Sequence, residues 1–97
     1  MEVRHADKKL ERLESDRGYR AGFDARLVKV FRQRMALIRD AVDERDFYKL
    51  KSLHYEKLKG DRKHQRSMRL KDAFRLIIEI EEVGQKTIVV ISIVDYH

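Results

Sequence analysis

The sequence of 97 residues contains no cysteine and no proline. Without cysteine, disulfide frameworks, thiolate zinc sites and cysteine nucleophiles are excluded. No apolar run approaches the length of a membrane span, and the first residues lack the apolar segment of a signal peptide. We therefore expect a single cytoplasmic domain over residues 1–97, which is long enough to bury one core without cross-links.

Motifs for metal and nucleotide chemistry are also missing from the sequence. The four histidines include no pair at the spacing of a helical metal site, and HEXXH is absent. There is no glycine-rich phosphate loop, no GXSXG elbow and no acidic cluster that could hold two metal ions. The sequence therefore predicts no metal and no other cofactor, and it argues against nucleoside triphosphate chemistry.

The sequence has an excess of positive charge, and this charge is concentrated in one segment. The net charge is +6. Residues Lys49 to Arg75 hold ten Lys or Arg and three acids, a surplus of seven that leaves −1 for the rest of the chain. A solvated surface is the ordinary explanation of a charge run, but a surplus confined to one segment favours contact with phosphate groups.

The end of the sequence predicts the central strand of the fold. Thr87 to Val94 is an apolar, β-branched run, which is typical of a strand buried on both faces. Two more strands, Gln65 to Leu70 and Ala73 to Glu81, are predicted before it, and Gly84 marks the hairpin turn that precedes it. Met1 to His5 is predicted to form a short strand at an edge of the sheet.

Two helices are predicted before the hairpin-connected strands. Asp7 is placed to cap a short polar helix. Asp24 is placed to cap the main helix, from Ala25 to about Asp43. Apolar residues recur in the main helix every three or four positions, which is the spacing of a face packed on a core. They are Leu27, Phe31, Met35, Ile38 and Val42.

Phe47 to Leu53 is predicted to form a short helix or turn that presents Phe47, Leu50 and Leu53 to the interior. The order of elements predicts an α+β fold, in which two N-terminal helices pack on one face of a small, mostly antiparallel twisted sheet. The other face is expected to be open and basic. It would carry Ser67, Arg69, Lys71 and Arg75.

Groups that can transfer protons occur in the charged loop and after the last strand. Side chains alternate along a strand, so Asp95 and His97 are expected on one face and Tyr96 on the other, unless the strand end bends. With His54 and the nearby cations, these groups suit metal-free RNA cleavage. In that reaction a base removes the ribose 2′-OH proton, cations stabilise the phosphorane and an acid protonates the leaving 5′-oxygen. Terminal histidines more often only face solvent, so spacing alone also leaves a non-catalytic RNA-binding module open.

The residues from Leu53 to His97 resemble the HigB branch of the RelE-like superfamily, the toxins of bacterial toxin–antitoxin pairs. Two motifs carry the resemblance: LHYEKLKGDR, which begins at Leu53, and the terminal DYH. The resemblance implies a microbial RNase fold and ribosome-dependent mRNA cleavage that inhibits translation. It also implies neutralisation by a helix-turn-helix, HigA-like antitoxin, with operator DNA bound only through that antitoxin.

The resemblance also assigns roles to individual residues. The catalytic residues that it implies are His54, Asp95, Tyr96 and His97. The RNA-binding residues that it implies are Lys57, Arg62, Lys63, Arg66, Arg69, Lys71 and Arg75. Lys71 and Ala73 stand where many relatives have asparagine and glutamine. The alternatives are an RNA- or ribosome-binding homologue without activity, and a structural partner of the antitoxin in a repressor complex.

Overall fold

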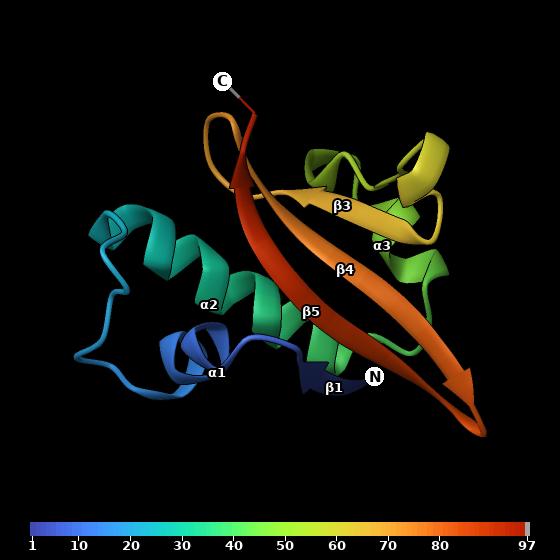
Figure 1. Ribbon diagram of the computed structural model, residues 1–97, viewed down its shortest axis with the longest axis horizontal. Coiled ribbons are helices and arrows are strands. Elements are labelled where there is room, and N and C mark those ends of the chain that lie inside the picture. Colours follow the sequence, from blue (N-terminus) through green and yellow to red (C-terminus); the bar gives the residue numbers. More distant parts are fainter. Residues whose placement is uncertain (97) are drawn as a thin grey trace.

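The computed structural model describes residues 1–96 of the chain (Figure 1). Its helices are α1 (Lys8–Ser15), α2 (Ala25–Asp40) and α3 (Arg45–Lys49), with short 3-10 turns η1 (Lys51–Leu53) and η2 (Gly60–Arg62). Its strands are β1 (Glu2–His5), β2 (Glu56–Lys57), β3 (Gln65–Arg69), β4 (Phe74–Val83) and β5 (Gln85–Asp95).

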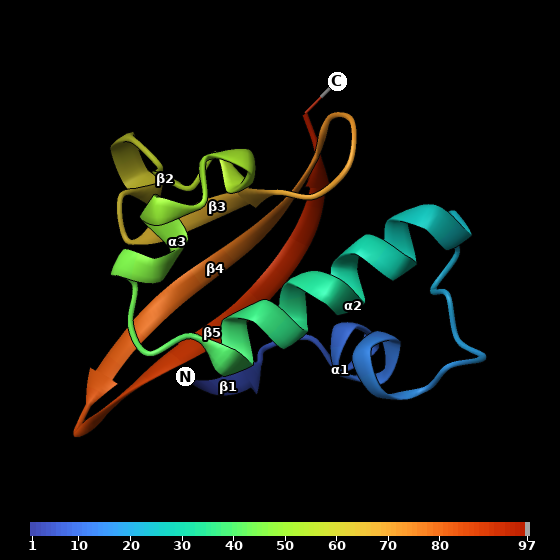
Figure 2. The ribbon, with the colours of Figure 1, turned by 180° about the vertical axis from the view of Figure 1, so that it is seen from behind.

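The described strands form one sheet in the order β1-β5-β4-β3-β2. β1 pairs with β5 in parallel, and the other pairs are antiparallel. Helices α1 and α2 cover one face of the sheet, behind β4 and β5 in Figure 1 and in front of them in Figure 2. The predicted α+β fold, with helices on one face of a mostly antiparallel sheet, is therefore confirmed.

The predicted helix starts are confirmed by their caps. The Asp7 carboxylate accepts a hydrogen bond from Lys9 N at 2.8 Å, and the Asp24 carboxylate accepts one from Arg26 N at 2.8 Å. Each cap satisfies a backbone donor that the first helical turn leaves unpaired. The residues of α2 that are buried lie at the predicted helical spacing; they are Leu27, Val28, Phe31, Met35 and Ile38.

Two residues that were predicted to be buried are exposed. Helix α2 ends at Asp40 because Ala41 is extended, so Val42 leaves the apolar stripe and is 86% exposed. Its N–H donates instead to the Asp46 carboxylate at 2.9 Å, in the first turn of α3. Leu50 is 43% exposed because it is extended between α3 and η1, where helical periodicity is interrupted. Phe47 and Leu53 are buried as predicted.

The sheet has two unlike faces. The core face packs on α1 and α2, and its buried residues are Met68, Leu76, Ile78, Ile88 and Val90. The open face carries the alternate residues, among them Ser67, Arg75 and Ile77. A bulge in β5 leaves Ile91 between the paired residues Val90 and Ser92, so the strand can place Ile93 back on the core.

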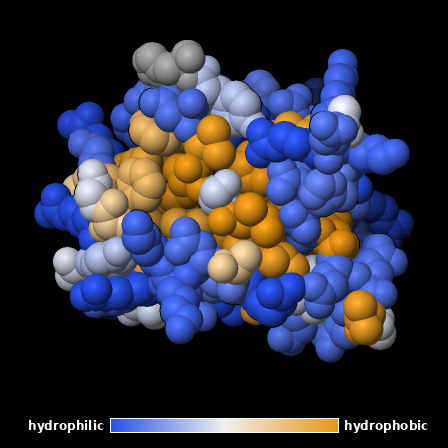
Figure 3. Space-filling model, viewed as in Figure 1, coloured by the Kyte–Doolittle hydropathy of each residue, from blue (hydrophilic) through white to orange (hydrophobic). Residues whose placement is uncertain are grey.

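The open face is not uniformly basic, which corrects the prediction. Apart from Val83 at the hairpin tip, four apolar residues of β4 and β5 lie outside the core cluster: Ile77, Val89, Ile91 and Val94. Figure 3 shows apolar surface across the centre of this face, surrounded by polar and charged groups. The prediction failed because β5 carries apolar residues on both of its sides. One of these two apolar rows packs on the core, and the other lies on the open face. Ile88, Val89 and Val90 are buried as predicted, whereas 91–94 are partly exposed.

Candidate functional site

His54 lies at the sharp turn between η1 and β2. Its backbone is left-handed, with φ 43° and ψ 48°, which is an uncommon conformation for a residue other than glycine. The turn is held on both sides: His54 N donates to Lys51 O at 3.1 Å, and His54 O accepts a hydrogen bond from Arg75 Nη2. The side chain of His54 is exposed. An exposed imidazole on a fixed backbone can meet a substrate from solvent.

Arg75 connects this turn to the open face of the sheet. Its Nε donates to Ser67 Oγ at 2.8 Å, its Nη2 also reaches Ser67 O at 3.3 Å, and it lies 3.7 Å from the Glu56 carboxylate. The side chain of Arg75 is only 17% exposed, and Ser67 is fully buried. The guanidinium therefore satisfies a buried hydroxyl and fixes the position of the His54 backbone.

The end of β5 lies beside this arginine. Arg75 is in register with Val94, and Asp95 is in register with Phe74. Tyr96 N donates to Ala73 O at 3.0 Å, so pairing continues past the last residue of β5. His97 lies outside the described residues, and the predicted placement of Asp95 and His97 on one face is not tested.

Tyr96 is linked to the charged loop through Arg62. Arg62 Nη1 donates to Tyr96 Oη at 3.4 Å, and Arg62 Nε donates to Gln65 Oε1 at 2.9 Å. Gln65 Nε2 in turn donates to Glu79 Oε2 at 3.0 Å on β4. These contacts form a chain of polar side chains that ties the loop containing η2 to the open face and to the end of β5. Tyr96 remains 45% exposed.

Of the remaining predicted RNA-binding residues, Arg69 lies beside this site, in register with Arg75, and the other four do not gather there. Arg69 is exposed at the end of β3, and its carbonyl accepts a hydrogen bond from Arg34 Nη2 at 3.0 Å. Lys71 pairs with Asp72 at 2.8 Å in the turn between β3 and β4. Three others lie at the β2–β3 edge on the side of the sheet that faces away from His54. They are Lys57, Lys63 and Arg66, and they line a groove together with His64 and Glu44.

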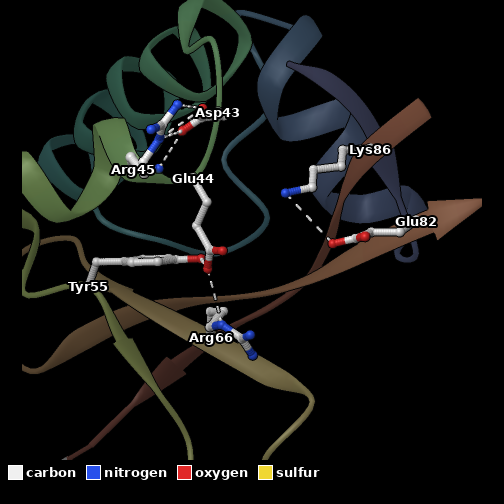
Figure 4. A network of polar contacts seen from close by, with 7 residues as sticks. All are labelled: Asp43, Glu44, Arg45, Tyr55, Arg66, Glu82 and Lys86. Atoms are coloured by element: carbon white, nitrogen blue, oxygen red, sulfur yellow. Dashed lines mark hydrogen bonds and ion pairs between the residues drawn. The ribbon is translucent and has the colours of Figure 1, made fainter. Parts of the chain in front are cut away.

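A partly buried network behind this edge was not expected from the sequence. Glu44 accepts a hydrogen bond from Tyr55 Oη at 2.6 Å and one from Arg66 Nε at 3.2 Å (Figure 4). Burial, with the hydrogen bond to Glu44 as the next cause, raises the pKa of Tyr55 well above its ordinary value, so its hydroxyl remains a donor. Arg66 therefore pairs with a carboxylate on the helix side. The sequence signal that could have shown this is alternation, which places Arg66 with Met68 and not with Ser67.

Residues 1–96 include no group of three or more His, Asp or Glu side chains arranged to hold a metal ion. Within the same residues, no helix is both long enough and apolar enough to cross a membrane.

Comparison with known proteins gives a structural likeness and no sequence match. No protein-family model matches the sequence. No curated protein matches it either. The structure is similar to that of the "YoeB/ParE toxin from Agrobacterium tumefaciens", with a TM-score of 0.61, 20% identity and all of both chains covered. At this identity the likeness establishes a shared fold, which agrees with the RelE-like fold predicted from the sequence.

Proposed function

We propose that this protein is the toxin of a bacterial toxin–antitoxin pair and acts as an endoribonuclease. The observation that carries the proposal is the arrangement at one end of the open face: Arg75 holds the turn of His54 and lies in register next to the end of β5, where Arg62 contacts Tyr96. The shared fold with a YoeB/ParE toxin supports the toxin class. The finer assignment, the HigB branch with cleavage of mRNA on the ribosome, has its support in the two sequence motifs.

The proposed chemistry is a transesterification that needs proton transfer and charge stabilisation. A base removes the proton of a ribose 2′-OH, and the oxygen attacks the adjacent phosphorus. The bond to the 5′-oxygen then breaks as an acid protonates it, which leaves a 2′,3′-cyclic phosphate. His54 and His97 share the two proton transfers, since histidine is the side chain most often used as a general acid or base. Asp95 orients one of them or contacts RNA, and Arg62 and Arg69 offer cations for the phosphorane charge.

The partner in this proposal is a helix-turn-helix antitoxin of the HigA type. The apolar centre of the open face, which includes Ile91 and Val94, offers a partner the contact area that RNA alone does not need. The cations around it would attract an acidic segment. Such a partner would cover the candidate site directly, and it alone would contact operator DNA.

The test is expression from a tightly controlled promoter, with bacterial growth and the 5′ ends of mRNA measured. The wild type should stop growth and produce new mRNA ends within codons. His54→Ala should reduce cleavage by a factor of roughly 10² to 10⁴, the usual share of a general acid or base. Ser52→Ala is the control and should leave cleavage unchanged, because Ser52 is an exposed residue of η1 close to His54 in the chain and has no role in the proposed reaction. Equal cleavage by the wild type and His54→Ala would remove His54 from the mechanism.

A non-catalytic RNA- or ribosome-binding protein is the second candidate function. One observation favours it: Arg75 is occupied by Ser67, His54 and Glu56, and is therefore not free for a phosphate in this conformation. This candidate predicts that the protein sediments with ribosomes and leaves mRNA ends unchanged. Sedimentation and mapping of mRNA ends in one culture separate the two functions.

A further inference from the structure

Arg62 belongs to an exposed turn, yet side chains from other parts of the chain hold its guanidinium. It is the last residue of η2 and is itself exposed. Its Nε donates to Gln65 Oε1 at 2.9 Å, and its Nη1 donates to Tyr96 Oη at 3.4 Å. An exposed arginine samples many rotamers unless its guanidinium has partners. These two contacts therefore direct the Arg62 guanidinium toward the end of β5.

Gln65 is the first residue of β3, and both ends of its amide are used. Its Oε1 accepts from Arg62 Nε, and its Nε2 donates to Glu79 Oε2 at 3.0 Å. Gln65 and Glu79 are in register on neighbouring strands, so their side chains share one face of the sheet. An ionised carboxylate only accepts hydrogen bonds, so Glu79 takes the NH₂ group of Gln65 and leaves the amide oxygen for Arg62.

Glu79 is held by a second neighbour. Its Oε2 also lies 3.5 Å from His64 Nε2, and its side chain is partly buried. The contacts therefore run from the sheet to the turn, from Glu79 to Gln65 to Arg62 and on to Tyr96. The sequence pointed to neither Gln65 nor Glu79 as a site residue, because a side chain that acts through a neighbour has no motif of its own.

We infer that Gln65 and Glu79 are positioning residues for Arg62 and affect cleavage only through it. The inference rests on the proposed function, in which Arg62 offers a cation for the phosphorane charge. Such a cation must already face the charge when it develops, because turning toward it during the reaction costs free energy. The guanidinium fork has more N–H donors than the contacts with Gln65 and Tyr96 use, so it can be held and still bind a phosphate oxygen.

The test is a double-mutant cycle on the cleavage of mRNA by the protein and purified ribosomes. Gln65→Ala should lower kcat by about tenfold with KM nearly unchanged, the loss of roughly one hydrogen bond to a charged group. In the Arg62→Ala background the same substitution should lower kcat by less than about twofold, since Gln65 has no other route to the reaction. Glu79→Gln should cause a smaller fall than Gln65→Ala, because an amide still accepts from Gln65 but no longer fixes which way it turns.

A second measurement follows Arg62 directly and needs no cleavage. The Nε–H nuclear magnetic resonance signal of Arg62, assigned by its loss in Arg62→Ala, should relax as a rigid group in the wild type and as a flexible one in Gln65→Ala. Gln33→Ala is the matched control, because Gln33 is an exposed glutamine of α2, on the helix side of the sheet. It should leave both the signal and kcat unchanged. Circular dichroism of each variant checks the fold.

The two measurements separate this inference from the proposed function. Equal falls in kcat from Gln65→Ala in both backgrounds, or a rigid Arg62 signal in Gln65→Ala, would overturn the inference. If either result is seen while the wild type cuts RNA, the inference fails alone. If the wild type cuts no RNA, the proposed function fails, and loss of the rigid signal in Gln65→Ala still shows that Gln65 positions Arg62.

Discussion

Ser67 is a buried polar residue in an otherwise apolar part of the sheet, and its hydroxyl has a defined task. It accepts the hydrogen bond of Arg75 Nε at 2.8 Å. Ser67→Ala should lower the free energy of unfolding by about 1–3 kcal/mol, because it leaves a largely buried donor unpaired. Urea unfolding measures this change. Ser52→Ala, at an exposed serine of η1, should change it by less than about 0.5 kcal/mol; an equal loss in both variants would show that the Ser67 hydrogen bond contributes nothing specific.

Arg75 was predicted from the sequence to bind RNA, and its contacts suggest a different role within the proposed function. A lysine has one donor nitrogen, so it cannot reproduce the separate hydrogen bonds of Arg75 Nε to Ser67 Oγ and of Arg75 Nη2 to His54 O. Arg75→Lys keeps the charge, so a role in positioning His54 predicts a fall in kcat with KM nearly unchanged. A direct contact with RNA predicts mainly a rise in KM. Steady-state kinetics of Arg75→Lys beside Arg69→Lys, an exposed arginine of β3, separates the two roles.

Among the elements, β1, α1 and α2 meet at Glu14. Its carboxylate contacts His5 Nε2 at 2.8 Å, and it accepts hydrogen bonds from Arg39 Nε at 2.7 Å and Arg39 Nη2 at 2.9 Å. The hydrogen bond from Arg39, opposed in part by burial, holds the pKa of Glu14 below its ordinary value of 4.5. A carboxyl whose folded pKa is lowered stabilises the protein above its unfolded pKa, and the stabilisation is lost as the pH falls through the folded value.

Glu14→Gln should therefore be less stable than the wild type at pH 7, by about 1 kcal/mol since Arg39 is half exposed. The difference should shrink as the pH is lowered below 4.5. Urea unfolding from pH 7 to pH 3 tests this. Asp61→Asn, at an exposed carboxylate of η2, is the control and should differ from the wild type by less than about 0.5 kcal/mol at each pH. A difference that is constant with pH would mean that the ionised carboxylate of Glu14 is not the stabilising form.

The elements also show how far the sequence could be interpreted. The caps Asp7 and Asp24, the hairpin at Gly84 and the strand after it were predictable because each depends on local chemistry. The exposure of Val42 and Leu50 was not predictable, because a single extended residue interrupts the helical periodicity at each of these places. The two-residue strand β2 has no local signature, yet its pairing with β3 sends Lys57 and Glu56 to different faces. The basic segment is continuous in sequence, but alternation along β2 and β3 divides its side chains between the two sides of the sheet.

At the scale of the whole molecule, the open face combines an apolar centre with the candidate site at one end, as Figures 1 and 3 show together. If, as proposed, an antitoxin covers the open face, the protein within that complex should not sediment with ribosomes, whereas the free protein should. A charge placed in the apolar centre should prevent this masking, because a partner would have to bury it unpaired. Ile91 is suited to the test, since it is partly exposed and outside the core cluster.

Ile91→Asp should therefore keep its fold, lose affinity for the antitoxin, and remain bound to ribosomes when the antitoxin is added. Val83→Asp is the matched control, because Val83 is 83% exposed at the far end of the β4–β5 hairpin and should leave masking intact. Circular dichroism of both variants checks the fold, and co-sedimentation with ribosomes, with and without antitoxin, gives the result. Sedimentation of the intact wild-type complex with ribosomes would show that the antitoxin acts elsewhere and that the open face stays accessible in the complex.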